Sequence, residues 1–593
     1  MNCVRRFISS FRMSIGLGAL VVAMLQAALP AAEVPAPVLA AERERIAAIA
    51  RASQTAVAIF AGEAGGGSGV LISPDGYALT NFHVVQPAGI AMKCGLSDGR
   101  VYDAVLVGLD PTGDVALVKL VGRDDFPFAE LADSDLVEVG DFCFAAGNPF
   151  LLATDLKPSI SAGIVSGVHR YQFPAGTILE YADCLQVDAA INPGNSGGGL
   201  FDEAGRLIGV NGRASFEKRG RVNVGVGYAI SANQLRNFLG FLKGGRLVDH
   251  ATLGATVATD EDGRVVVSDI LESSDAYRRG LRYDDEIVSL AGRPVRTVNA
   301  LKNILGTLPA GWRVPVVFRR AGRRMEILVR LEGLHRPTEL ARLVAAEEAE
   351  QKGPPSPGGA PRPATPAPVV LPDAVKDLYE ARNGFTNHRF NLLERDRVAA
   401  GIAAASTWAT PAAAWVMTGR LETGAPFRIV LSDTRGLIDL PTGTTDVDAT
   451  GELDADPSPP GSGGLLAALL LWRRLVIAGP EKLGRTSYWG TQPRDPAALD
   501  AAGAADLVDV LETAAAAVEA RFAVADDGGV IGIELWPAPD ADPCEVRLEP
   551  RPAGQPGMPA VIEVRHGDAL FGRFFVEEFQ FEPVAPEPAG ETS

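Results

Sequence analysis

Between residues 56 and 230 the sequence consists of short apolar runs separated by turn residues, and this pattern constrains the fold most strongly. The run Gly69–Ile72 is followed by the turn residues Pro74–Gly76 and then by the run Tyr77–Thr80. Runs this short, separated by Gly, Asp and Pro, are typical of antiparallel strands joined by tight turns. The pattern therefore predicts a β-barrel or β-sandwich in this part of the chain.

The chain has 593 residues, which is too many for one hydrophobic core, so several domains are expected. After about residue 250 the pattern changes to strands that flank two helical stretches, which indicates a small α+β domain. A segment rich in Pro, Ala and Gly follows; it cannot form a core and is typical of a linker. The predicted segments are residues 1–32, a leader; 42–245, the β domain; 249–335, the small α+β domain; 347–372, the linker; and 373–585, a further α+β domain.

The carboxy-terminal domain is the least informative part of the sequence. Alternating residues in Val518–Val524 and Val530–Trp536, separated by a Gly-rich turn, predict a hairpin. Helices are predicted over Leu465–Ile477 and Pro496–Ala516. The strand Ala560–Val564 and the segment before it are weakly similar to the curved half-barrel of lipoprotein-carrier-like folds. An unassigned substrate-binding or interaction domain is the other interpretation.

Composition excludes several classes of function. Lys and Arg total 55 against 73 Asp and Glu, a net charge of −18, and no long basic run exists, so nucleic acid is not expected as a partner. The five cysteines are too few for a disulfide scaffold, and none forms a C-x-x-C pair, so they are expected to be buried or free thiols. We therefore expect no metal site and no cofactor.

The amino terminus has the layout of a secretory signal. Arginines at positions 5, 6 and 12 precede an uncharged apolar stretch over Ile15–Leu29, and small residues follow at Ala31 and Ala32. A cleaved signal peptide and an uncleaved membrane anchor both fit a stretch of this length. Either one predicts export to the periplasm or cell envelope, with the membrane as a partner only if the segment stays attached.

Three segments of the β domain together supply the parts of one reaction: Thr80–Val85, Asp110–Val118 and Asp188–Gly198. A serine hydroxyl needs an adjacent base, and the base needs a group that fixes its tautomer. His83 can take the proton of Ser196, and an acid in the second segment, Asp114 or its neighbour Asp110, can hold the imidazole. The glycines near Ser196 allow the backbone N–H groups of Gly194, Asn195 and Ser196 to form an oxyanion hole.

These segments resemble the HtrA/Deg family of trypsin-like serine endopeptidases over residues 56–335. The resemblance rests on Gly67–Ile72, Thr80–Val85, Asp114–Leu117, Gly147–Phe150, Ser161–Ser166 and Gly194–Gly198. It implies a chymotrypsin-like double β-barrel and the triad His83, Asp114 and Ser196, because the family's acid begins the D-[VI]-A-L strand. It also implies unfolded proteins or peptides as substrates and a homotrimeric assembly.

The residue six positions before the nucleophile lies at the base of the specificity pocket in chymotrypsin-like barrels, and here it is Ala190. A buried carboxylate would be needed to pair a substrate Lys or Arg, so we predict cleavage after small or medium apolar residues. The resemblance also places Val210, Asn211 and Gly212 in this pocket.

The small α+β domain resembles a PDZ domain in Ser273–Ala276 and Asp284–Pro294. PDZ domains add a peptide strand to a sheet edge and capture its terminal carboxylate on backbone N–H groups. The resemblance places that loop at Leu253, Gly254 and Ala255, with C-terminal peptides as partners; the alternative is that Gly254 only starts a strand. A peptide-binding chaperone or sensor with little proteolysis is therefore the alternative to a protease.

Overall fold

The protein is described here by a computed structural model, which covers residues 34–61, 66–148, 155–172, 178–216, 223–351, 371–410, 413–449, 458–499, 506–515, 517–538, 541–551 and 558–583. The chain divides into two compact units between Arg51 and Ala52, and helix α2 (Ala36–Thr55) crosses this division. All described strands belong to the second unit. The predicted signal peptide, residues 1–32, lies outside the described residues. Within the described ranges, no helix is long and apolar enough to cross a membrane.

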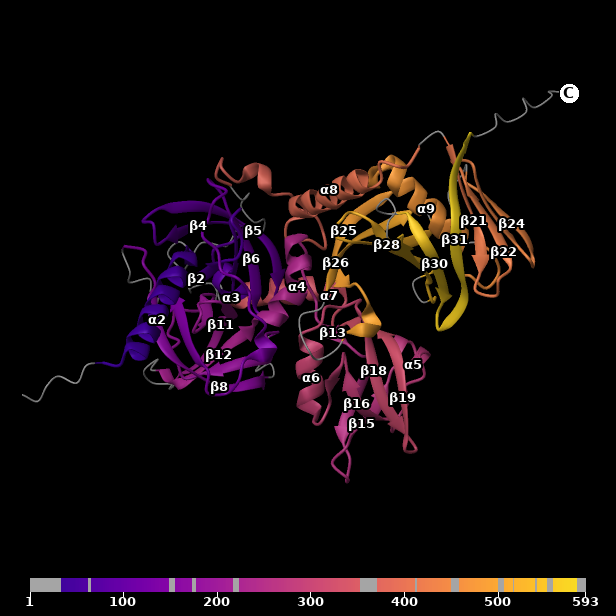
Figure 1. The fold of residues 1–593 in the computed structure, drawn as a ribbon. Helices are drawn as coiled ribbons and strands as arrows, with labels where there is room; N and C mark the ends of the chain where they lie inside the picture. Colours follow the sequence, from indigo (N-terminus) through magenta and orange to yellow (C-terminus); the bar gives the residue numbers. More distant parts are fainter. Residues whose placement is uncertain are drawn as a thin grey trace, which may run out of the picture. The chain divides into compact units, whose positions relative to one another are not determined.

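Six antiparallel strands close the first barrel in the order β1-β2-β3-β6-β5-β4 (Figure 1). They are β1 (Ala56–Phe60), β2 (Gly66–Leu71), β3 (Tyr77–Thr80), β4 (Ala91–Leu96), β5 (Val101–Asp110) and β6 (Val115–Leu120). Val57, Leu71 and Val118 belong to a buried apolar cluster in this barrel, as the alternation of the short runs predicts. The short helix α3 (Phe82–Val85) follows β3 directly.

A second barrel closes in the order β10-β11-β12-β9-β8-β7. Its strands are β7 (Phe142–Gly147), β8 (Ser159–Gln172), β9 (Tyr181–Val187), β10 (Gly199–Asp202), β11 (Leu207–Phe216) and β12 (Asn223–Ser231), preceded by the 3₁₀ turn η2 (Ser134–Leu136). Helix α4 (Ala232–Lys243) begins directly after β12 and ends the β domain. The predicted double barrel is confirmed.

The next domain contains a six-stranded antiparallel sheet with the path β14-β15-β16-β18-β19, and β17 pairs with β16. Its elements are β13 (Ala251–Thr252), β14 (Ala255–Thr259), β15 (Val265–Ile270), α5 (Asp275–Arg278), β16 (Glu286–Leu290), β17 (Arg293–Pro294), α6 (Val298–Gly306), β18 (Arg313–Arg320), β19 (Arg323–Arg330) and β20 (Glu332–Gly333). The strands and both helices that the sequence predicts are therefore present. Strand β14 lies at one edge of the sheet.

Helix α7 (Pro337–Gln351) follows this domain. The first five residues of the predicted linker, 347–351, are therefore helical rather than extended. Residues 352–370 of that linker lie outside the described part of the chain.

One 11-stranded antiparallel sheet forms most of the carboxy-terminal domain, in the order β24-β23-β22-β21-β31-β30-β29-β28-β27-β26-β25. The strands are β21 (Ala413–Leu421), β22 (Pro426–Leu431), β23 (Arg435–Leu440), β24 (Gly443–Asp448), β25 (Arg485–Pro493), β26 (Leu507–Ala515), β27 (Val518–Val524), β28 (Val530–Trp536), β29 (Cys544–Pro550), β30 (Pro559–His566) and β31 (Ala569–Pro583). The helices are η4 (Lys376–Leu378), α8 (His388–Ala405), α9 (Leu465–Ala478), η5 (Pro480–Lys482) and η6 (Pro496–Ala498).

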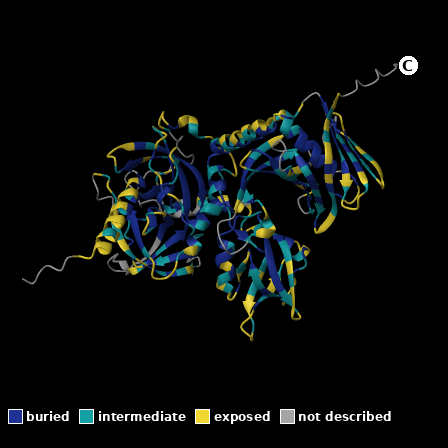
Figure 2. Ribbon diagram, in the orientation of Figure 1, coloured by how far each residue is buried: buried dark blue, intermediate teal, exposed yellow. Residues whose placement is uncertain are grey.

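This sheet curls around helix α9. The helix contacts β22, β23 and β24 at one end of the sheet and β28 and β29 nearer its other end. Ten of its fourteen residues are buried, including Trp472, and Figure 2 shows the helix as mostly buried. A helix that is apolar all round must be covered on several sides, and the curved sheet supplies that cover.

The helix predicted over Pro496–Ala516 is wrong. Only Pro496–Ala498 is helical, as a 3₁₀ turn, and Leu507–Ala515 forms strand β26 between β25 and β27. The Ala-rich composition favoured a helix, but Val508, Val510 and Thr513 are buried in the sheet. Pairing on both sides and burial outweigh local propensity, which is only a weak preference.

Candidate active site

The three predicted segments converge on the two barrels. His83 lies in helix α3, directly after β3, and Asp114 directly precedes β6 in the first barrel. Ser196 lies in the loop between β9 and β10 of the second barrel. The backbone of β2 joins the two parts, because Ser68 N–H donates to the carbonyl of Ser196 at 2.9 Å.

The acid Asp114 is fully buried and holds His83 through two hydrogen bonds. His83 Nδ1 lies 2.8 Å from Asp114 Oδ2, and the His83 backbone N–H donates to Oδ1 at 3.1 Å. Burial works against protonation of His83, but the charge and hydrogen bond of Asp114 outweigh it and raise the pKa of the imidazole. With Nδ1–H held by the carboxylate, Nε2 is the nitrogen that can accept a proton.

Asp114 also receives a hydrogen bond that the sequence did not predict. The hydroxyl of Tyr181, at the start of β9, donates to Asp114 Oδ2. Tyr181 is 67 residues from Asp114 in the sequence, so only the joining of the two barrels brings them together. This contact lets the second barrel help to hold the acid of the first.

The hydroxyl of Ser196 donates to the carbonyl of Gly212 at 3.2 Å. Among the hydrogen bonds of the described residues, none joins Ser196 to His83. Ser196 is partly exposed, whereas Gly212 is buried. In this arrangement the serine must rotate away from Gly212 before His83 can take its proton.

The predicted oxyanion hole needs one correction. The N–H of Asn195 already donates to the carbonyl of Asn192 at 2.9 Å, so it does not point toward a substrate. For the N–H groups of Gly194 and Ser196, no partner is found among the described residues. Gly194 has a φ of 101°, a conformation that residues with a side chain rarely adopt. The N–H groups of Gly194 and Ser196 therefore remain as the candidate donors of the predicted oxyanion hole.

Ser68 is a further residue at this loop that sequence reasoning missed. Its hydroxyl donates to the carbonyl of Gly194 at 2.6 Å and accepts the N–H of Asn148 at 2.8 Å. Because its own N–H binds the Ser196 carbonyl, this one residue contacts the oxyanion loop on both sides of Asn195. The available signal in the sequence was the position of Ser68 between two glycines, Gly67 and Gly69.

The residues predicted for the specificity pocket differ in their accessibility. Ala190 is exposed, and its carbonyl accepts the hydroxyl of Ser161 at 2.9 Å. Val210 and Asn211 are fully buried on β11, so their side chains do not line an open surface. Gly212 lies next to Ser196, because its carbonyl accepts the hydrogen bond of the Ser196 hydroxyl.

Asp110, the rival acid, is bound to a different histidine. His250 Nε2 lies 2.8 Å from Asp110 Oδ2, and both side chains are buried. The structure therefore separates the two acids: Asp114 is the one that contacts His83.

At the predicted peptide-binding loop, Leu253 is buried, Gly254 has a φ of 69°, and Ala255 begins the edge strand β14. A Cβ on Gly254 would lie 2.5 Å from Ser274 Cβ. The loop therefore requires glycine for both its conformation and its close approach to Ser274.

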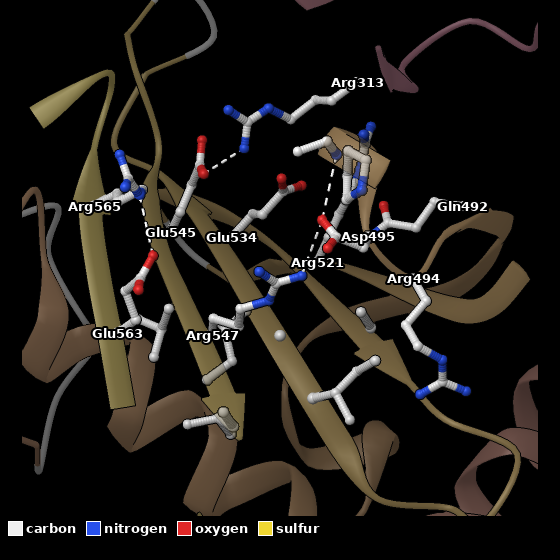
Figure 3. A pocket seen from close by; sticks show the side chains of 18 of the residues that line it. Arg313, Gln492, Arg494, Asp495, Arg521, Glu534, Glu545, Arg547, Glu563 and Arg565 are labelled. Carbon is white, nitrogen blue, oxygen red and sulfur yellow. Dashed lines mark hydrogen bonds and ion pairs between the residues drawn. The ribbon is translucent and has the colours of Figure 1, made fainter. Parts of the chain in front are cut away.

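A separate cavity of about 510 Å³ lies against the carboxy-terminal sheet. Its lining carries arginines that face carboxylates: Figure 3 shows Arg313 opposite Glu545 and Arg565 opposite Glu563. Apolar residues such as Val546 and Leu548 also border the cavity, between the charged residues of β29. Because the arginines are paired, the cavity has no surplus charge that would define a ligand.

The described residues contain no group of three or more His, Cys, Asp or Glu side chains arranged to hold a metal ion. Cys94, Cys143, Cys184 and Cys544 are all buried, free thiols. Burial raises the pKa of the Cys94 thiol to about 12, so it is protonated near neutral pH.

Two closed six-stranded barrels, with a partly exposed His bound to a buried Asp on one and a serine in a Gly-rich loop of the other, define the class of trypsin-like serine peptidase domains. Residues 67–210 match the family described as the trypsin-like peptidase domain. The chain is similar to the periplasmic serine endoprotease DegP of Escherichia coli K12, with 37% identity over 278 residues. It is also similar to the probable periplasmic serine endoprotease DegP-like of Chlamydia trachomatis serovar D, with 34% identity over 284 residues. Over this part, the chain is similar to serine proteases of the HtrA/Deg family.

The similarity covers part of each protein. It extends over 45% of this chain and 56% of the E. coli protein, and over 46% and 54% for the Chlamydia protein, so the chain spans about half the length of these relatives. A solved structure titled "HtrA-type protease AlgW with tripeptide" is 31% identical; the match covers 50% of this chain and 98% of that one, with a TM-score of 0.41.

Proposed function

We propose that this protein is an exported serine endopeptidase that degrades unfolded or misfolded proteins. The observation that carries the proposal is the buried Asp114 carboxylate, which fixes His83 beside the loop that bears Ser196. The activity named for the DegP relatives supports it. Their names also include the word periplasmic, which supports export to that compartment.

The proposed reaction follows from the hydrogen bonds. Asp114 holds Nδ1–H of His83, so Nε2 accepts the proton when Ser196 attacks the substrate carbonyl. The imidazolium that forms is stabilised by the buried carboxylate, and the same proton then passes to the leaving amine. The N–H groups of Gly194 and Ser196 donate to the oxyanion, and a donor of this kind contributes about 2.7–4 kcal/mol.

For specificity, we propose that small or medium apolar side chains occupy the position before the cleaved bond. Ala190 supplies no carboxylate to pair a substrate Lys or Arg, and an unpaired cation in a desolvated pocket would be costly. Digestion of a peptide library tests this: a clear preference for Arg or Lys would contradict it.

We also propose that the domain at residues 249–335 is a PDZ domain that binds C-terminal peptides. Edge strand β14 can accept a further strand, and the left-handed Gly254 sits directly before it. Helix α6 contacts β14, which supplies a second wall. A homotrimeric assembly is likewise proposed from the family resemblance.

The experiment that tests the protease is labelling with a fluorophosphonate probe, together with cleavage of unfolded casein. Wild type should label and cleave, and Ser196→Ala should do neither, because it lacks the nucleophile. If wild type prevents aggregation of unfolded protein but neither labels nor cleaves, the chaperone alternative replaces the protease. Residual cleavage by Ser196→Ala would show a route that does not use this serine.

Labelling of wild type only after a C-terminal peptide is added would show that peptide binding switches the site on. This result would agree with the hydrogen bond of Ser196 to Gly212, which holds the hydroxyl away from His83.

A further inference from the structure

A second His–Asp pair, this one fully buried, contains Asp110, which lies four residues before the proposed catalytic acid Asp114. His250 Nε2 lies 2.8 and 3.0 Å from the two carboxylate oxygens of Asp110. The side chains are 3% and 1% exposed, so the pair is excluded from water. The ring of Phe238 stacks on His250 with centroids 4.6 Å apart, which fixes the plane of the imidazole.

Asp110 shapes the turn that delivers Asp114. Its Oδ1 accepts the N–H of Gly113 at 2.8 Å, which closes a short turn between β5 and β6. A Cβ on Gly113 would collide with the Asp110 carboxylate and would lie 2.9 Å from His250 Nε2. The turn is therefore packed directly against the His–Asp pair, with no room for a side chain.

Asp114 leaves this turn in a strained conformation. Its φ is 57°, which lies in the left-handed region. For a residue other than glycine this conformation costs roughly 1–3 kcal/mol, and it persists only when the surrounding structure imposes it. Its carbonyl is held on the other side by the Asn81 side chain at 2.9 Å and by the Phe82 N–H at 3.3 Å. The Asp110 turn is the constraint on its amino-terminal side.

His250 belongs to the segment that joins the barrels to the next domain. Its carbonyl accepts the N–H of Leu334 at 2.9 Å, and it forms a β-bridge with Pro309. The same residue thus has its backbone bound to the second domain and its side chain bound to the turn of the first barrel.

We propose that His250 is a positioning residue of the active site, which holds the Asp110 turn and thereby presents Asp114 to His83. The proposal rests on the proposed protease function, since it assigns Asp114 the role of the catalytic acid. It makes the alignment of the triad depend on the segment that enters the second domain.

The charged groups around His250 strengthen its hydrogen bond to Asp110. Burial works against its protonation, but Asp110, with smaller contributions from Asp249 and Glu180, outweighs burial and raises the pKa of His250. The imidazole of His250 is therefore a hydrogen-bonding partner of the buried Asp110 carboxylate, and its removal would take that partner away.

The test compares three variants of the full-length protein on a short chromogenic peptide. His250→Phe removes the donor to Asp110, whereas His250→Gln keeps an N–H near the position of Nε2. His335→Phe is the matched control, because His335 pairs with Asp249 at 2.9 Å in the same junction without touching Asp110.

We expect His250→Phe to lower kcat by about 10- to 100-fold with little change in KM, as a misplaced catalytic group does. His250→Gln should recover most of kcat, and His335→Phe should lower the melting temperature without lowering kcat. Rescue by Gln separates positioning from a general loss of stability, since the imidazole ring is lost in both variants.

Equal kcat values for folded His250→Phe and wild type would overturn the proposal, as would equal losses of kcat in His250→Phe and His335→Phe. If His250→Phe does not fold, the other two variants provide the test. The proposal is overturned if folded His250→Gln is inactive. It is also overturned if His335→Phe loses as much kcat as His250→Gln does. Failure of wild type itself to react with a fluorophosphonate would instead refute the proposed protease function.

Discussion

Replacement of Ser68 by alanine should damage the oxyanion hole although Ser68 is not part of the triad. The hydroxyl joins the carbonyl of Gly194 to the N–H of Asn148, with distances of 2.6 and 2.8 Å. Gly194 is one of the two remaining candidate donors of the hole. Loss of the hydroxyl would leave its carbonyl without this donor and would allow the loop to move.

The magnitude follows from these two hydrogen bonds. Each contributes about 1 kcal/mol net, and a buried group that loses its partner costs about 1–3 kcal/mol, so we expect a loss of about 2–4 kcal/mol in the free energy of unfolding. The effect on catalysis has an upper bound, because one oxyanion donor is worth about 10²- to 10³-fold in rate. Ser68→Ala loosens the loop but does not remove the donor, so we expect kcat of this variant to fall by about 10²-fold, at the lower end of this range.

The assay measures the rate of fluorophosphonate labelling and the melting temperature on the same samples. Ser432→Ala is the matched control, because its hydroxyl also donates to a backbone carbonyl and accepts a backbone N–H, both of Arg435, at 3.1 and 2.9 Å. This control lies in the carboxy-terminal sheet and should lose stability without losing labelling rate. If Ser68→Ala loses stability but labels as fast as wild type, the reasoning is refuted.

Three further predictions concern the triad and the peptide-binding loop. Because Asp114 raises the pKa of His83, kcat/KM should fall as the pH decreases through a value above the usual histidine value of about 6.5; a pH profile with its acid limb below that value would contradict this. Tyr181→Phe removes a hydrogen bond to the Asp114 carboxylate, so kcat should fall and the acid limb should move to higher pH; an unchanged profile would show that the contact is not used. Gly254→Ala places a Cβ 2.5 Å from Ser274 Cβ at a φ of 69°, so affinity for C-terminal peptides, measured by fluorescence anisotropy, should drop at least tenfold, and unchanged affinity would place the peptide elsewhere.

The fold of the first two domains could be predicted because local signals and tertiary structure agree there. Strand β16 (Glu286–Leu290) is one of the strands expected in the small α+β domain, and turn residues flank it. The hairpin of β27 and β28 is likewise present at Val518–Val524 and Val530–Trp536. In such segments the period of the pattern and the pairing of the strands require the same residues to face the core.

Strand β26 shows where this agreement ends. Leu507–Ala515 has an Ala-rich neighbourhood, and its two acids, Asp509 and Glu512, would also be accessible on a helix. Its place in the sheet is set by pairing with β25 on one side and β27 on the other, its two neighbours in the sequence. The helix prediction failed because this pairing and the burial in the sheet outweigh the helix propensity of the Ala-rich segment.

The parts of the active site that were missed share one cause. Tyr181 and Ser68 act through hydrogen bonds that cross from one barrel to the other, over 67 and 126 residues of sequence. A tyrosine at the start of a strand and a serine between glycines have many ordinary roles. Their functional role becomes visible only once the barrels are closed and joined.

The two acids of the second segment illustrate how the structure resolves an ambiguity that spacing could not. Asp110 and Asp114 both lie at the ends of neighbouring strands, and either could orient a histidine. The structure gives each its own histidine: His83, 31 residues before Asp114, and His250, 140 residues after Asp110. One short turn joins the acids, and Asp114 and the His250–Asp110 pair are buried, so displacement of Asp110 would move Asp114 as well. The residue that competed for the catalytic role is therefore the one best placed to control it.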